Sequence, residues 1–351
     1  MKNLSRREFG KKVSLGVGFA FLGTAFRVAA QTKSPLRLMS TIPMPGFEGC
    51  DFDHFDYDLK SNRLFLAAED HKTVEVFNLR TGEHLRSVSG FEQPHAIVYL
   101  PDSNQLIVTV GNAGLGICKL VSGKTYEITD TMKLPPGADN AVFDPSTQYC
   151  YVESRSPEPG ADRNLLNIID TRTFKLIGGI TLPGKVSQAM EIRHSDKKLF
   201  INLATTNEVG VVDLQTRQVV ARWPVPEASV QDALALDETN HRVFIACGKP
   251  PSFIAFNADT GRVVANLPCV GVNDDMFYDA IHKRIYVTGE GTTSVFQQKD
   301  PDHYEHIAEV PTGFQGKTGL FVPELNRLYI ELSGAAKPEA KLALMIFEAQ
   351  N

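Results

Sequence analysis

The residues best suited to chemistry stand at one repeated position of this sequence. A short strand motif, such as the one from Arg284 to Val287, recurs seven times, and its copies begin 42 to 49 residues apart. Ten residues before every copy there is a polar side chain: Asp53, His95, Asp139, Gln188, Asp232, Asp274 and Lys317. The next position is polar in four copies: His54, Asn140, Asp275 and Thr318. If the copies surround an axis, these side chains form a polar ring.

Such a ring needs positive charge or protons. Carboxylates 4 Å apart repel each other by about 4 kcal/mol per pair at a surface-like dielectric, so they require a cation, a cationic ligand, Lys317 or shared protons. A hard ion such as Ca²⁺ or Mg²⁺ suits Asp, Asn and Gln oxygens, whereas His95 with His54 suits a transition metal. One divalent metal ion is therefore the candidate cofactor. Its candidate ligands are Asp53, His95, Asp139, Asp232 and Asp274.

Two functions are compatible with this ring. The first is binding of a small molecule or short polymer at the mouth of a central tunnel, a concave site of the kind that ligands use. The second is a metal-dependent lyase or hydrolase, in which the metal polarises a carbonyl group or a water molecule and a catalytic His95, Asp139 or Asp232 moves the proton. The alternative to both is a set of strand ends that are polar because they meet water. No nucleophile elbow, zinc-helix motif, phosphate loop or dinucleotide glycine pattern occurs, so the sequence does not decide whether the protein is an enzyme.

Further ligand contacts are expected beside the ring. Loops between the second and third strands of the repeats should open on the same face and form an outer wall: Glu69, Asp70, His71, Glu153, Arg155, Asn202, Lys249 and Glu290. The long loops 153–164 and 333–341 are candidate lids. Glu191 interrupts an apolar column, so it reaches the tunnel or pairs with Arg193. The predicted ligand-binding residues are Asp53, His54, Glu69, Asn140, Arg155, Gln188, Glu191, Asp274, Asp275, Glu290 and Lys317.

The elements that must position these residues are strands. From Phe277 to Gly289 the sequence reads strand, polar turn, strand, with aromatic and β-branched residues of the kind that strands prefer. Seven copies of such a unit predict an all-β fold, a seven-bladed β-propeller with one four-stranded sheet per repeat. The seventh unit has no fourth strand of its own. Residues 36–43 have an outer-strand pattern and are expected to complete that blade, which removes an open sheet edge.

The repeats resemble the YVTN-type (YncE-like) seven-bladed propellers. Residues 285–289, Ile-Tyr-Val-Thr-Gly, nearly reproduce the motif after which that family is named, and the resemblance covers residues 36 to 348. It implies the propeller fold and an extracytoplasmic setting, but no single activity, because the family is functionally mixed. A single tryptophan, Trp223, argues against WD-type repeats and against quinoprotein propellers.

The first 30 residues have the pattern of a twin-arginine signal peptide. Arg6 and Arg7 precede an apolar run from Val13 to Phe26 and a small-residue stop at residues 28–30. A membrane anchor is the alternative, but the run is shorter than the about 20 residues that a span needs. We expect a periplasmic or otherwise exported protein, a single propeller domain over residues 31–351, no membrane association after cleavage, and the twin-arginine export machinery as a partner.

Charge and cysteine content narrow the partners. The chain of 351 residues carries a net charge of −5, and the first 30 residues hold six basic side chains against one acidic side chain. The remainder is therefore at −10 and has no basic run, which argues against nucleic acid as a partner. The five cysteines lack metal or haem spacing. Cys118 and Cys150 are expected in the core, and a bridge between Cys247 and Cys269 is an open alternative.

Overall fold

A computed structural model describes residues 33–112, 114–155, 160–334 and 341–351. The expected signal peptide, residues 1–30, lies outside these residues, as do parts of both long loops. The chain divides into two units, Met1–Lys33 and Ser34–Asn351, and the description below concerns the second. In the described part of the chain, no helix has the length and apolar character of a membrane span.

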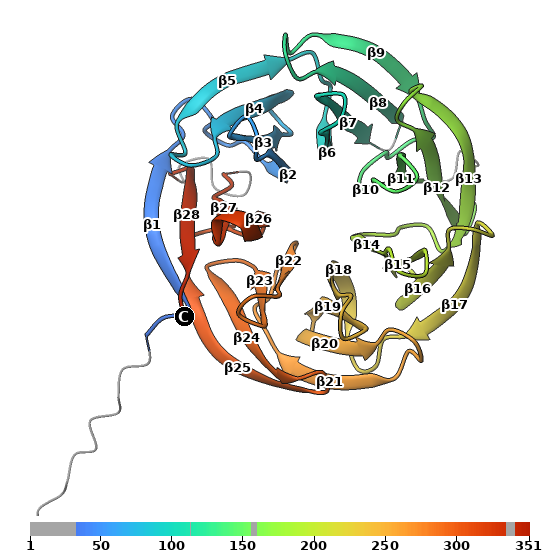
Figure 1. The fold of residues 1–351 in the computed structure, drawn as a ribbon, viewed down its shortest axis with the longest axis vertical. Helices are drawn as coiled ribbons and strands as arrows, with labels where there is room; N and C mark the ends of the chain where they lie inside the picture. Colours follow the sequence, from blue (N-terminus) through green and yellow to red (C-terminus); the bar gives the residue numbers. More distant parts are fainter. Residues whose placement is uncertain (1–32, 113, 156–159, 335–340) are drawn as a thin grey trace, which may run out of the picture. The chain divides into compact units, whose positions relative to one another are not determined.

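The described residues form seven four-stranded antiparallel sheets arranged in a ring (Figure 1), which confirms the predicted all-β, seven-bladed propeller. In each blade the strands follow one another from the central axis outward. Blade 1 contains β2 (Phe52–Asp58), β3 (Arg63–Ala68), β4 (Thr73–Asn78) and β5 (His84–Ser89). Blade 2 contains β6 (Pro94–Leu100), β7 (Gln105–Asn112), β8 (Leu115–Ser122) and β9 (Ile128–Lys133). Blade 3 contains β10 (Ala141–Asp144), β11 (Tyr149–Arg155), β12 (Arg163–Asp170) and β13 (Lys175–Pro183).

The next three blades repeat this order. Blade 4 contains β14 (Met190–Arg193), β15 (Lys198–Leu203), β16 (Glu208–Asp213) and β17 (Gln218–Pro224). Blade 5 contains β18 (Ser229–Asp237), β19 (Arg242–Lys249), β20 (Pro251–Asn257) and β21 (Val263–Pro268). Blade 6 contains β22 (Met276–Asp279), β23 (Arg284–Thr288), β24 (Thr292–Asp300) and β25 (His303–Pro311).

Blade 7 is assembled from both ends of the unit. It contains β26 (Gly319–Val322), β27 (Arg327–Glu331) and β28 (Ala343–Ala349), with a short 3₁₀ helix, η1 (Pro323–Leu325), between the first two. Its outer strand is β1 (Leu36–Pro43), which pairs antiparallel with β28 from Leu36 opposite Ala349 to Pro43 opposite Ala343. Figure 1 shows β1 in blue beside β28 in red.

The hairpin between the first and second strands of every blade has the same backbone conformation. The residue directly before each second strand has a positive φ angle: Asn62, Asn104, Gln148, Lys197, His241, Lys283 and Asn326. Three of the seven are Asn, a residue that tolerates this left-handed region. In blades 1, 3, 5 and 6 an Asp at the end of the first strand accepts backbone N–H groups of the same turn, as Asp279 does from Ile281 and His282.

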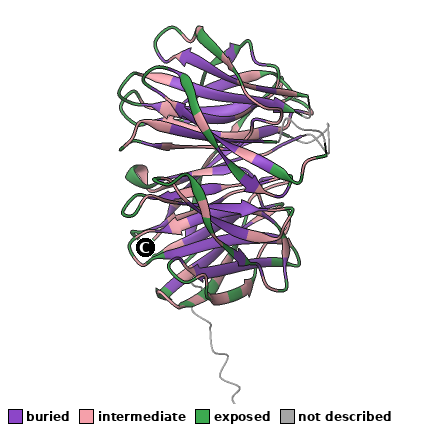
Figure 2. Ribbon diagram, turned by 90° about the vertical axis from the view of Figure 1, so that its right-hand side faces the viewer, coloured by how far each residue is buried: buried purple, intermediate pink, exposed green. Residues whose placement is uncertain are grey.

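The core lies between adjacent blades. The second strands are buried on both faces, as β3 is along its whole length, whereas outer strands such as β5 are mostly exposed. Phe65 of blade 1 packs with Val108 of blade 2, and Tyr329 of blade 7 packs with Phe77 of blade 1. Figure 2 shows this distribution, with buried strands and exposed loops. The packing fixes every first strand beside the central axis.

Candidate functional site

The predicted polar ring lines one cavity of about 180 Å³ at one end of the tunnel. We call this end the polar mouth. All seven residues that stand ten positions before the repeated strand motif contribute to its wall: Asp53, His95, Asp139, Gln188, Asp232, Asp274 and Lys317. His54, Asn140 and Glu69 line it as well. The structure thus brings together the residues that the repeat alignment singled out.

Irregularities in the first strands aim several of these side chains at the axis. The pairing of β2 with β3 shifts register between Phe52 and Phe55, so Asp53 and His54 lie in a bulge. The same shift places His95 in a bulge of β6 and Asp232 in a bulge of β18. In the other four blades the ring residue comes before the first paired residue of the strand. Bulges turn side chains away from the regular alternation of a strand.

His95 is held by hydrogen bonds at both ring nitrogens. Its Nδ1 lies 2.5 Å from Asp53 Oδ2, and its Nε2 lies 2.7 Å from the carbonyl oxygen of Gly111. A carbonyl oxygen only accepts, so Nε2 carries a proton. Burial opposes the charged form, but the Asp53 carboxylate, the charge of Asp139 and the Gly111 carbonyl raise the pKa of His95 to about 10. His95 is therefore an imidazolium at neutral pH, and neither nitrogen is free to act as a base; a metal ion would have to displace the Nδ1 proton or the contact with Gly111.

A second imidazole shares the same carboxylate. His54 Nε2 lies 3.3 Å from Asp53 Oδ1, and His54 Nδ1 lies 3.6 Å from Asp275 Oδ1. Burial works against its charge, yet Asp53 and Asp275 raise the pKa of His54 well above its ordinary value. Burial works against ionisation of Asp53 too, but the two imidazoles, followed by Lys317, lower its pKa strongly. Asp53 is thus an ionised carboxylate between two imidazoliums.

Lys317 completes this charge-paired half of the ring. Its Nζ donates to Asp274 Oδ2 at 2.7 Å, and the same carboxylate oxygen accepts a hydrogen bond from Thr318. Asp275 Oδ2 accepts the backbone N–H of Gly319 at 2.9 Å. We name the residues of blades 6, 7, 1 and 2 the paired arc. Its members are Asp274, Asp275, Lys317, Asp53, His54 and His95.

The other half of the ring has no such partners. Among the described residues, the side chains of Asp232, Gln188 and Asn140 make no hydrogen bond, and Asp139 has one long ion pair, with His95 Nδ1 at 3.9 Å. The side chain of Asp139 is 38% exposed, against 16% for that of Asp53. We name these residues of blades 3, 4 and 5 the open arc, because their polar atoms face the cavity and not one another.

The pKa of each carboxyl group of the open arc is raised above its ordinary value. Burial, with a smaller contribution from the charge of Asp274, raises the pKa of Asp232 to about 6. Burial and the charge of Asp53 also raise the pKa of Asp139. Glu69 of blade 1, which accepts a hydrogen bond from Gln93, also has its pKa raised mainly by burial. A positively charged ligand in the cavity would lower the pKa of these groups.

Residues at the ends of the second strands fix the backbone of the mouth. Thr109 donates to the carbonyl oxygen of Asp139 at 2.7 Å, and Asn202 donates to those of Asp232 and Ala233 at 3.3 and 3.0 Å. Thr288 makes the equivalent contact with Lys317. Each of these hydrogen bonds joins the second strand of one blade to the backbone of the ring residue in the next blade. They therefore hold neighbouring ring residues in place from the side away from the cavity.

Two acids occupy this same position in the repeat, and the sequence did not single out their role. Glu153 is buried; burial and the charge of Asp139 raise its pKa to about 8. Glu331 is fully buried, both of its carboxyl oxygens lack a partner, and burial raises its pKa well above the ordinary value. In both acids the raised pKa favours the neutral form. They could have been found by reading the repeat alignment four residues into each second strand.

The expected outer wall is only partly present. Glu69 lines the polar mouth, and Arg155 and Glu153 line a side cavity of about 310 Å³ that also contacts His95, Asp139 and Gln188. Asn202 is buried behind the ring, and among the residues described, Asp70, His71, Lys249 and Glu290 line neither of these two cavities.

Glu191 lies in the tunnel and not in an ion pair with Arg193. Arg193 instead binds Asp196 and Asp259, each at 2.7 Å. A middle cavity of about 150 Å³ shares His54 and Asn140 with the polar mouth and contains Glu191. The apolar column has a second interruption, Asp56, which the sequence reading missed. It accepts N–H groups from Tyr57 and Tyr99 at 2.7 and 2.6 Å.

Two overlapping groups at the polar mouth have the spacing of metal ligands. Asp53, Glu69 and His95 form one, and Asp53, His54 and Asp139 form the other, with ligand atoms within 4.8 Å of one another in each. Oxygen and imidazole donors of this kind suit a divalent ion. Asp232 and Asp274, also expected as ligands, belong to neither group.

The cysteines are all free thiols. Cys118 and Cys150 are buried in one cluster between blades 2 and 3, as expected. Cys247 and Cys269 are not bridged. Burial is the main cause that raises the pKa of each of these two thiols to about 12, so neither is an activated nucleophile.

Comparison with known proteins identifies the fold and no family. No protein-family model matches this sequence, and neither does any curated protein. Among solved structures, a chain of the mitotic checkpoint complex is similar with a TM-score of 0.73 at 13% identity, covering 99% of this chain and all of that chain. A chain of Kuenenia stuttgartiensis hydrazine synthase gives 0.71 at 16% identity over 84% of this chain and 95% of its own. The WD40 repeats of RRP9 give 0.69 at 11% identity over 90% and 98%. At these identities the likeness shows the β-propeller fold alone.

Proposed function

We propose that this protein is an exported ligand-binding propeller whose polar mouth captures a small hydrophilic molecule, or the end of a short polymer, rich in hydrogen-bond donors. The observation that carries the proposal is the difference between the two arcs. The paired arc satisfies its own charges, whereas the side chains of Asp139, Gln188 and Asp232 in the open arc line the cavity and make no hydrogen bond to any described residue. Polar groups that converge on a cavity without satisfying one another are typical of binding sites.

The chemistry of the open arc favours amines and polyhydroxy compounds. Two carboxyl groups accept hydrogen bonds, and the amides of Gln188 and Asn140 both donate and accept. A bound ammonium group would lower the pKa of Asp232 and release its proton. The adjoining side cavity offers Arg155 to an acidic or hydroxyl-bearing extension of the ligand.

The test is a thermal-shift screen of monosaccharides, short oligosaccharides, polyols and small amines against the mature protein. A true ligand raises the melting temperature, and Asp139→Asn or Asp232→Asn removes the shift while the unliganded protein still melts cooperatively. Glu290→Gln is the matched control, because this acid lies at the same end of the blades, between β23 and β24, but outside the cavity. A shift that survives both Asp substitutions would refute the open arc as the site.

A metal-dependent lyase or hydrolase is the second candidate, favoured by the two groups that share Asp53. A divalent ion held there would polarise a carbonyl group or a water molecule next to the open arc. Asp139 would then be the proton carrier, since both nitrogens of His95 are occupied. Metal analysis of the protein matured in its own host should find a stoichiometric ion. If none is found, and chelator leaves the melting temperature unchanged, the metal-dependent function is wrong.

Export is proposed from the sequence pattern of residues 1–30 and from the resemblance to YVTN-type propellers. Replacing Arg6 and Arg7 together with Lys should retain the precursor inside the cell. Cell fractionation with N-terminal sequencing measures this directly, and an exported double variant would rule out the twin-arginine route.

A further inference from the structure

The opposite end of the tunnel holds a second cavity with different chemistry. All first strands run in the same direction, so the polar mouth lies at their beginnings and this cavity lies at their ends, in β14, β18, β22 and β26. Its volume is about 340 Å³, within the usual range for small-molecule sites. We call it the aromatic mouth. Its wall includes Glu191, Glu238, Met276, Phe277 and Phe321.

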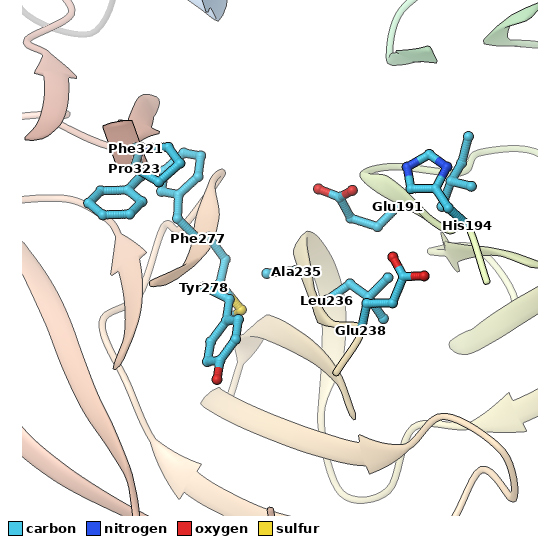
Figure 3. Close-up of a pocket in the computed structure, with 11 residues that line it drawn as sticks. Glu191, His194, Ala235, Leu236, Glu238, Phe277, Tyr278, Phe321 and Pro323 are labelled. Atoms are coloured by element: carbon cyan, nitrogen blue, oxygen red, sulfur yellow. The ribbon is translucent and has the colours of Figure 1, made fainter. Parts of the chain in front are cut away.

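One wall of the aromatic mouth is acidic. Figure 3 shows the carboxyl group of Glu191 extending into the open space, with Glu238 and His194 on the same side. Glu238 already accepts a hydrogen bond from Ser195 N at 2.8 Å. Glu191 has neither a hydrogen bond nor an ion pair within the described part of the chain. Burial alone raises its pKa to about 7.

The repeat supplies an internal comparison for Glu191. Asp56 occupies the same position in blade 1, and there the carboxyl group is satisfied by two backbone N–H groups. In blade 4, no described residue donates such a hydrogen bond to Glu191. A carboxyl group without partners in a partly apolar wall is costly, and the cost is removed when a ligand brings a donor to it.

The facing wall is apolar and aromatic. Phe277 and Phe321 lie across the cavity from Glu191 in Figure 3, and Phe321 packs on Tyr286 with ring centroids 5.3 Å apart. The hydroxyl of Tyr278 donates to Gln298, which leaves its ring as the surface near the cavity. None of the described residues in this wall is Lys or Arg.

Acid opposite aromatic rings is the arrangement that binds organic cations, because ring faces and carboxylates both attract positive charge. A metal ion is disfavoured here, since the described side chains whose ligand atoms converge all lie at the polar mouth. We propose that the aromatic mouth binds an amphipathic organic cation. The ammonium group lies at Glu191, and the apolar body packs on Phe277 and Phe321. This proposal does not rest on the function proposed for the polar mouth; the middle cavity, which also contains Glu191 and Phe277, lies between the two sites.

Benzyltrimethylammonium is the probe, with benzyl alcohol and benzenesulfonate as the neutral and anionic comparisons. Isothermal titration of the mature protein at pH 8 should detect the cation, with the two comparison compounds binding at least about tenfold more weakly. Glu191→Gln keeps the size of the side chain and should weaken binding of the cation about tenfold. Phe277→Leu should weaken it several-fold.

Two matched controls locate the site. Asp56→Asn changes the equivalent acid of blade 1, and Asp232→Asn changes the polar mouth; both should leave the affinity for the cation unchanged. The proposal is overturned if the cation binds no better than benzyl alcohol, if Glu191→Gln has no effect, or if Asp232→Asn abolishes binding. Should either variant at the aromatic mouth fail to fold, the affinity of the unmodified protein must still rise from pH 6 to pH 8 as Glu191 ionises.

Discussion

The two ends of the tunnel place their charges in opposite ways. At the polar mouth, Asp53 lies between His54 and His95, and Lys317 neutralises Asp274, so half of the ring is internally paired. At the aromatic mouth, Glu191 faces aromatic rings and has no hydrogen-bond or ion-pair partner among the residues that the structure describes. The same first strands build both ends. The difference therefore comes from which positions along each strand are polar. The charges of the paired arc stabilise the structure, whereas Glu191 is left to contact a ligand.

Removing the shared carboxylate should have the largest effect. Asp53→Ala leaves two buried imidazoles that repel each other when protonated, and we expect a loss of about 3 kcal/mol in the free energy of unfolding at pH 6. The loss should be smaller at pH 9, because without Asp53 the imidazoles lose their protons at lower pH. Denaturant unfolding at the two pH values measures this. An equal loss at both would show that the network is not ionic.

The hydrogen bonds from Asn202 and Thr109 to the backbone of the ring should have the second largest effect on stability. Asn202→Ala removes two hydrogen bonds to the backbone of blade 5 and should cost about 2 kcal/mol. It should also weaken any ligand that depends on Asp232. Thr109→Val is the matched change behind Asp139. If denaturation midpoints stay unchanged in both variants, these contacts do not hold the mouth in place.

At the aromatic mouth, removing the acid should stabilise the unliganded protein, whereas removing Asp53 at the polar mouth should destabilise it. The pKa of Glu191 is about 7 in the folded protein and about 4.5 ordinarily. The folded state thus binds the proton more tightly, and stability is lost as pH rises from about 4.5 to 7. Glu191→Gln should therefore stabilise the unliganded protein by about 1 to 2 kcal/mol at pH 8, after allowance for partial exposure. It should have little effect at pH 4.5. Thermal melting across this range is the measurement, and destabilisation at pH 8 would contradict an unpartnered acid.

The smallest effect is expected on the loops. Lys249→Met and Glu290→Gln change exposed side chains outside the cavities and should alter stability by no more than about 0.5 kcal/mol. Neither should affect binding at either mouth in titrations. A marked loss of binding in one of them would extend the polar mouth to the loop surface.

The fold and the position of the ring could be predicted from sequence because both repeat. Seven copies of the strand motif determine the propeller, and counting back from them reaches Asp53, His95 and Lys317. The hydrogen bonds and ion pairs between side chains of neighbouring blades could not be predicted in this way. That His95 uses both nitrogens depends on the carbonyl of Gly111 and on the bulge at Asp53. The position of Asn202 in the outer wall was predicted without knowledge of blade 5, whose backbone carbonyl groups accept hydrogen bonds from its side chain. Asp56 was available in the same alignment column as Glu191 and was overlooked.

The pairing of β1 with β28 sets the order in which the ring can be completed. Blades 1 to 6 are each made of consecutive strands, so each can form once its own segment of chain exists. Blade 7 joins residues 36–43 to residues 343–349. Contacts this distant in sequence carry a large loop-closure cost and form slowly. We therefore expect β1 to pair late in folding. Until it does, the outer edge of β28 stays unpaired and open to other chains, even though the inner strands that line both mouths are already in place.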